Sequence, residues 1–228
     1  AALASMTRAC TLRDAGLRLE WHALHAAAMG GKAGIDQRTV IARLGAALAD
    51  PQTVCAQMGL VITYAVDLVR FLTEPCSEAR AAFAQAWAAA LEVLESDNTL
   101  SLADQLSALR VRIRLARLGA PLEDMAVLVR ARVADALAKV GDPALRHAVL
   151  NSAAGILADA GLLDDAEALL VGELERSHSP FYFMHNLAAI AKKRGDPARA
   201  INWYEQAWNG ARGAATRLQW GATYLQSL

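Results

Sequence analysis

A spacing of 34 residues near the carboxyl end constrains the fold of this chain more than any other feature. Gly161 and Gly195 are 34 residues apart, and so are Ala166 and Ala200. Each glycine ends one helical pattern of apolar residues, and each alanine lies five residues later, inside the next pattern. Such a period is typical of helix–turn–helix units that stack side by side and bury one another's apolar faces. It favours a surface that binds other molecules over a pocket that does chemistry.

The rest of the chain also has a helical pattern. Of its 228 residues 55% are apolar, which is ample for a core, and alanine is both a strong helix former and small enough to let helices approach closely. Glycine and proline fall between the apolar runs, and no alternating strand pattern exceeds about four residues. We therefore expect an all-α chain of about eleven helices, in which short links make successive helices antiparallel neighbours. They are expected at about 5–28, 36–49, 53–72, 77–96, 101–118, 122–139, 144–160, 164–177, 181–194, 197–209 and 214 onward.

Local signals mark several of the helix ends. Asp50-Pro51 predicts a stop and a restart, with proline at an early helical position. The segment from Ser101 to Asp104 resembles a capping box, with Asp in place of Glu or Gln. Asp164-Asp165 begins a helix, where the helix dipole favours negative charge.

The segment 186–207 carries a family resemblance. Ala188 lies in a first helix, Gly195-Asp196 forms the turn, and Ala200-x-x-x-Tyr204-x-x-Ala207 follows in a second helix. This pattern resembles a tetratricopeptide repeat, and the resemblance implies an antiparallel helix-pair array, a tetratricopeptide-like α-solenoid. In such a pair the small side chains let the two helices approach, and a left-handed glycine ends the first one.

The resemblance covers about 147–228. A weaker unit precedes the clear one, and Trp220-Gly221-x-x-Tyr224 begins another. We therefore expect an irregular helical array over 1–143 and tetratricopeptide-like repeats over 144–228, packed as one continuous helical domain. Because the chain stops inside an apolar pattern and terminal repeats are usually capped by a polar face, we expect the natural protein to continue past Leu228.

A second, narrower resemblance lies in the same region. The segments 178–184, 191–196 and 215–221 are similar to the helical region that follows the thioredoxin domain in some bacterial thioredoxin-family proteins. Those proteins are exported, so the resemblance implies a periplasmic location, with a cytoplasmic one as the alternative. No Cys-x-x-Cys pair is present, so no thioredoxin activity is assigned to these residues.

Charge and hydropathy exclude other classes of protein. The 23 basic and 23 acidic residues give no net charge, which does not favour broad binding of nucleic acid. The longest apolar stretch, 58–66, is followed by Asp67 and Arg70 and falls far short of the roughly 20 residues that span a membrane. We expect neither nucleic-acid binding nor membrane insertion.

The tetratricopeptide resemblance also implies a candidate binding face. In such stacks the first helix of each pair lines a concave groove, with polar side chains suited to hydrogen-bonding an extended peptide. In that register six residues would face a protein or peptide partner: Asn151, Tyr182, His185, Asn186, Lys193 and Gln219. The family's chaperone-tail clamp uses lysines and asparagines, and His185 stands where a lysine is expected.

Other clusters have two interpretations each. His22 and His25 share a helix face and suit a metal site, although a structural role is the simpler interpretation. Arg110, Arg114 and Arg117, with Arg112 beside them, could grip a phosphate or form a solvated face. The cysteines, which are Cys10, Cys55 and Cys76, are odd in number and are read as buried small hydrophobes. One Cys10 or Cys55/Cys76 bridge stays open if the compartment is oxidising. Gly30-Gly31-Lys32 is read as a loop.

Together these patterns predict a protein–protein interaction or scaffolding module, accessory to a thioredoxin-like domain that these residues do not include. The alternative is a structural or homo-oligomerisation module without a peptide groove, which an exposed apolar strip over 214–228 would favour. We predict no catalysis, cofactor or metal. An enclosed pocket with two or more shifted pKa values would instead favour an enzyme.

Overall fold

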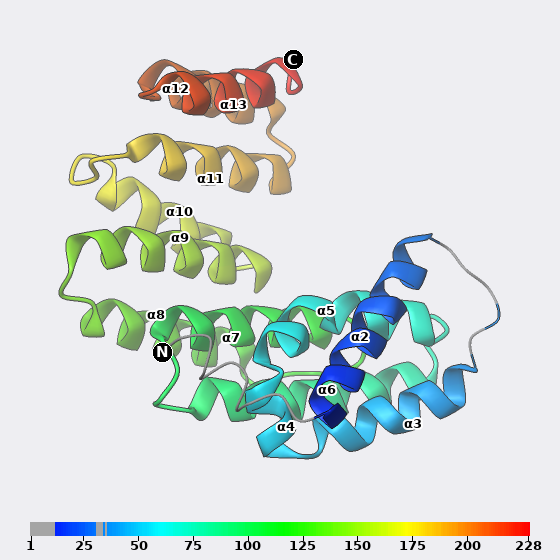
Figure 1. Cartoon of the computed structure of the whole chain (residues 1–228). Coiled ribbons are helices and arrows are strands. Elements are labelled where there is room, and N and C mark those ends of the chain that lie inside the picture. Colours follow the sequence, from blue (N-terminus) through cyan, green and yellow to red (C-terminus); the bar gives the residue numbers. More distant parts are fainter. Residues whose placement is uncertain (1–11, 31–33, 35) are drawn as a thin grey trace. The chain divides into compact units, whose positions relative to one another are not determined.

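A computed structural model describes residues 12–30, 34 and 36–228, and these form twelve helices and no strand. The all-α prediction is confirmed for this part of the chain (Figure 1). In chain order the helices are α2 (Leu12–Gly30), α3 (Gln37–Leu48), α4 (Pro51–Ala56), α5 (Met58–Leu72), α6 (Glu78–Ser96), α7 (Leu102–Ala116), α8 (Met125–Lys139), α9 (Pro143–Asp159), α10 (Leu163–Glu173), α11 (Pro180–Lys193), α12 (Pro197–Gly210) and α13 (Ala214–Leu225).

The helix expected over 53–72 is two helices, α4 and α5, which meet at Gln57. Its backbone leaves the helical region, with φ −111° and ψ 21°. Its side chain is buried, and Gln57 Oε1 accepts a hydrogen bond from Arg18 Nε at 2.8 Å. The break is therefore accompanied by a contact with Arg18 of α2, which lies 39 positions away in the sequence. No local sequence signal reveals this contact.

Two compact units divide between Glu123 and Asp124. This division lies before α8, whereas the change of sequence pattern that we predict lies after residue 143. We call the described residues up to Glu123 the first unit and residues 124–228 the second unit. That the two pack as one continuous domain stays a prediction.

The first unit is built around α6. Trp87 is fully buried, its ring lies 5.5 Å from that of Trp21, and its indole N–H donates to the Val61 carbonyl at 2.8 Å. Gly119 ends the α7 region with φ +113°, and a Cβ there would lie 2.8 Å from the Ala81 backbone. A side chain at residue 119 would therefore collide with α6 in a conformation that glycine alone adopts readily.

The second unit repeats one turn geometry. At Gly161, with φ +85°, the Leu162 N–H donates to the Leu157 carbonyl at 2.9 Å. At Gly195, with φ +76°, the Asp196 N–H donates to the Ala191 carbonyl at 3.0 Å. Both turns have the six-to-one bond of a Schellman motif, which closes a helix through a left-handed residue. The 34-residue spacing thus marks two equivalent helix ends.

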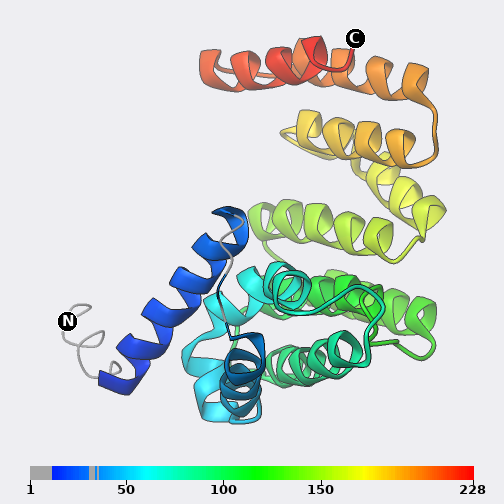
Figure 2. The ribbon, with the colours of Figure 1, turned by 90° about the vertical axis from the view of Figure 1, so that its right-hand side faces the viewer.

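Successive helices of the second unit pack against each other from α8 to α13, and α9 also touches α11 (Figure 2). Where α11 meets α12, Ala188, Ala191 and Ala200 are buried together with Tyr204. The small side chains bring the helices together and the tyrosine fills the remaining space, as the sequence predicts.

We expect Ala200→Leu to lower the free energy of unfolding by about 1–3 kcal/mol, because the added carbons have no room between α11 and α12. Ala198→Leu is the matched control, since Ala198 lies on the exposed side of the same helix. Urea unfolding monitored by circular dichroism measures both. Equal midpoints for the two variants would contradict tight packing at this crossing.

Candidate functional site

Aromatic rings from α9, α11 and α13 gather on one part of the second unit. The Tyr182 ring lies 5.7 Å from His147 and 5.6 Å from Trp220, in both cases edge to face. The His185 ring lies 4.6 Å from Trp220. Tyr182 keeps 42% of its surface exposed, whereas Trp220 is buried. These four rings form the ring cluster, with Tyr182 as its exposed member.

The polar candidates differ in what they contact. Asn186 Nδ2 donates to Asn151 Oδ1 at 2.8 Å, and Asn151 Nδ2 donates to the His147 carbonyl at 3.0 Å. Lys193 Nζ pairs with Asp159 Oδ1 at 3.0 Å and donates to the Ala158 carbonyl. These side chains therefore link α9 to α11, where Asn151 and Asn186 adjoin the ring cluster.

Gln219 is exposed on α13, next to Trp220 in sequence. The structure thus brings Asn151 and Asn186 together and places Tyr182 and His185 around Trp220. Lys193 lies two turns beyond Asn186 on α11.

Ion pairs connect other helices of the second unit. Arg130 Nε lies 2.8 Å from Asp165 Oδ2, which joins α8 to α10. Arg194 Nη2 lies 2.5 Å from Asp164 Oδ1, and Arg199 pairs with Glu167. Asp164 and Asp165 lie in the first turn of α10, as predicted, and they also hold neighbouring helices through charge.

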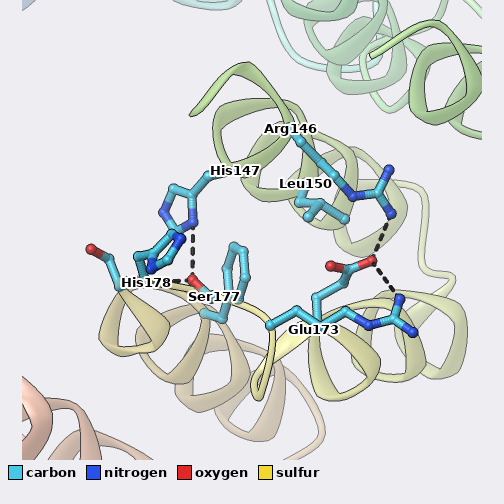
Figure 3. A pocket seen from close by; sticks show the side chains of 9 residues that line it. Arg146, His147, Leu150, Glu173, Ser177 and His178 are labelled. Carbon is cyan, nitrogen blue, oxygen red and sulfur yellow. Dashed lines mark hydrogen bonds and ion pairs between the residues drawn. The ribbon is translucent and has the colours of Figure 1, made fainter. Parts of the chain in front are cut away.

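A pocket of about 550 Å³ lies beside the ring cluster, and sequence reasoning missed it. Its walls come from α9, from the end of α10, from the linker 174–179 and from α11. Figure 3 shows Arg146 and Glu173 on one side and His147 with Ser177 on the other. The pocket exists because the linker folds back over α9, an arrangement that helical periodicity does not predict.

His147 and Ser177 form a hydrogen bond inside this pocket. Ser177 Oγ accepts the Ser179 N–H at 3.1 Å and lies 3.3 Å from His147 Nδ1. The Ser177 hydroxyl can donate to Nδ1 or accept from it, depending on which imidazole nitrogen carries the proton. Burial lowers the pKa of His147, so the ring is neutral at pH 7. No carboxylate of the described chain is hydrogen-bonded to Nε2, so the pair lacks the third group of a catalytic triad.

On the opposite side, two arginines share one carboxylate. Arg146 Nη2 lies 2.6 Å from Glu173 Oε1, and Arg176 Nη1 lies 4.0 Å from the same oxygen. The Glu173 side chain is 13% exposed and that of Arg176 is 77% exposed. Arg176 therefore has a loose contact and room to move.

His22 and His25, for which a structural role is the simpler interpretation, both have structural partners. His22 Nδ1 lies 2.6 Å from the Tyr64 hydroxyl, and His25 Nε2 lies 3.2 Å from Asp67 Oδ2. The His25 ring also stacks on Tyr64 at 4.1 Å. Within the residues that the structure describes, no three His, Cys, Asp or Glu side chains gather as metal ligands would.

The structure also bears on the arginine, cysteine and glycine clusters of the sequence analysis. Arg112 is buried and lies 3.3 Å from Glu95 on α6, so it does not join an open arginine stripe on α7. Cys55 and Cys76 are exposed and unbridged, which contradicts their interpretation as buried hydrophobes; both lie close to helix ends, where side chains face solvent. Cys10 and most of the Gly30-Gly31-Lys32 loop lie outside the described residues.

None of the described helices combines the length and the apolar character that crossing a membrane requires. Comparison with protein-family models, with curated proteins and with solved structures found no match to this chain.

We expect the second unit to lose stability as the pH falls below about 6.5. Burial lowers the pKa of His147 and of His185, so the unfolded chain takes up protons before the folded one does. The folded state has its full stability above the pKa that these histidines have in the unfolded chain. It loses stability as the pH falls toward their lower pKa values in the folded chain. Urea midpoints between pH 7.5 and 5.5 measure the loss, and His185→Phe, which keeps a ring beside Trp220, should reduce it. An unchanged pH dependence in this variant would contradict the role of His185.

Proposed function

We propose that the second unit is a tetratricopeptide-like stack of helix pairs that serves as a protein–protein interaction module. The matching turns at Gly161 and Gly195 support the stack, as do the packing of α9 on α10 and of α11 on α12 and the contact of α9 with α11. Each pair then buries the apolar face of the next. In this arrangement α9, α11 and α13 would line the binding face.

The observation that carries the binding role is the exposed Tyr182 at the centre of the ring cluster. Tyrosine is enriched among residues that dominate binding energies, because it combines a large rigid ring with a polar end. Trp220 and His147 both contact the ring edge to face, so little conformational entropy is lost when a partner covers it. The neighbouring Asn186 amide still has hydrogen-bonding capacity for a peptide backbone.

We further propose that this module assists a thioredoxin-like domain in meeting its protein substrates, in the bacterial periplasm. The support is the resemblance of segments 178–184, 191–196 and 215–221.

We expect the double variant Tyr182→Ala/Asn186→Ala to capture at least about tenfold less partner protein than the wild type, since an anchor of this kind contributes more than about 1.4 kcal/mol. Quantitative pull-down from extracts of the source organism measures the change. Val171→Ala is the control, because Val171 is an exposed apolar residue on α10. Undiminished capture by a folded double variant would count against this binding face.

An exposed strip on α13 favours a second candidate, homo-oligomerisation. Leu218 and Leu225, seven residues apart and thus on one helix face, are 76% and 70% exposed, and Leu228 is exposed beyond them. Large exposed apolar side chains on one face often mark an interface.

If two copies meet through this strip, Leu218→Ser/Leu225→Ser will convert a dimer into a monomer in sedimentation experiments. Leu145→Ser, which changes an exposed leucine on α9, should leave the dimer intact. A wild-type protein that sediments as a monomer at every concentration would remove this candidate.

A further inference from the structure

We propose that the pocket between α9, the linker 174–179 and α11 binds a small organic monocarboxylate with an aromatic or branched apolar body. The pocket shares His147 with the ring cluster, but the proposed binding face around Tyr182 does not use the arginines or the linker, so the inference goes beyond the function above. At about 550 Å³ the pocket has the size of a small-molecule site, since such sites typically enclose roughly 300–1,000 Å³.

The floor of the pocket suits an apolar group. Leu150 and Phe183 line it, and the His147 ring stacks on Phe183 at 4.5 Å with 24° between the planes. The His147 imidazole is neutral at pH 7 because burial lowers its pKa, so it presents a ring face and not a charge. A phenyl ring or a branched chain that enters here leaves water and contacts aromatic and aliphatic side chains, which favours binding.

The rim supplies the charge that a carboxylate needs. Arg146 is held by Glu173 at 2.6 Å, whereas Arg176 reaches the same oxygen at 4.0 Å and is largely exposed. A surface ion pair of this kind contributes little, so Arg176 can turn toward a ligand at small cost. Its guanidinium can then donate two parallel hydrogen bonds to a carboxylate.

The charged residues at the rim also favour a ligand with a single negative charge. Two arginines and one glutamate leave a single net positive charge at the pocket. A monoanion balances that charge, whereas a dianion such as phosphate would bring a second negative charge toward Glu173. Ser179 begins α11 and makes no capping hydrogen bond with its side chain, so its hydroxyl is available to a polar substituent on the ligand.

Calorimetric titration of the full chain with 3-phenylpropionate tests the proposal. We expect saturable binding that 3-phenylpropionamide and acetate fail to reproduce, because the first lacks the charge and the second lacks the ring. Equal binding of the amide, tighter binding of inorganic phosphate, or no binding of the acid would overturn the proposal. A peptide ending in phenylalanine that bound more tightly than the free acid would overturn the assignment to a small ligand.

Variants locate the site. Arg176→Gln should weaken 3-phenylpropionate binding at least about tenfold, consistent with the loss of a charge-assisted pair. Arg176→Lys keeps the charge and should retain part of the affinity. Arg212→Gln, an exposed arginine in the linker between α12 and α13, should bind as the wild type does. Unaltered binding by Arg176→Gln would place the ligand elsewhere and overturn the site.

Discussion

The close approach of α11 and α12 through alanine is the constraint on which the second unit depends. Ala188 and Ala200 leave no side chain beyond a methyl group between the helices, and Tyr204 occupies the gap beside them. The turn at Gly195 makes that approach possible, because its left-handed backbone reverses the chain within a few residues. The position of α11, which carries Tyr182 and one wall of the pocket, follows from this crossing.

Much of the local structure was predictable because short-range chemistry decides it. Gly161 and Gly195 adopt positive φ, as the repeat requires. The Ser101 hydroxyl accepts the Asp104 N–H at 3.2 Å, as the capping signal predicts. At Asp50-Pro51 the aspartate accepts the Gln52 N–H and proline occupies the first turn. Each signal acts within about four residues of the chain.

Features that depend on distant segments escaped prediction. The helix break at Gln57 accompanies a contact with Arg18, and the buried Arg112 is held by Glu95 of a different helix. The pocket arises from the same kind of cause, since the linker 174–179 brings Ser177 against His147. Amphipathic periodicity fixes which face of a helix is buried, but not which side chain of another helix it meets.

Several polar residues that the repeat pattern suggests for partner binding are instead bonded to residues about one repeat length away. Asn151 and Asn186 are 35 residues apart and bond to each other, and Lys193 pairs with Asp159, 34 residues before it. Lys193 thus faces its own counterpart in the preceding helix pair, and Asn186 faces the residue before its counterpart. Part of their hydrogen-bonding capacity is therefore used between helix pairs. In the binding module that we propose, discrimination between ligands then falls to residues outside the period. Tyr182 projects from the ring cluster, and Arg176 lies on the linker that joins one helix pair to the next. We expect substitutions at these two positions to change what the proposed module binds while the contacts between helix pairs stay intact.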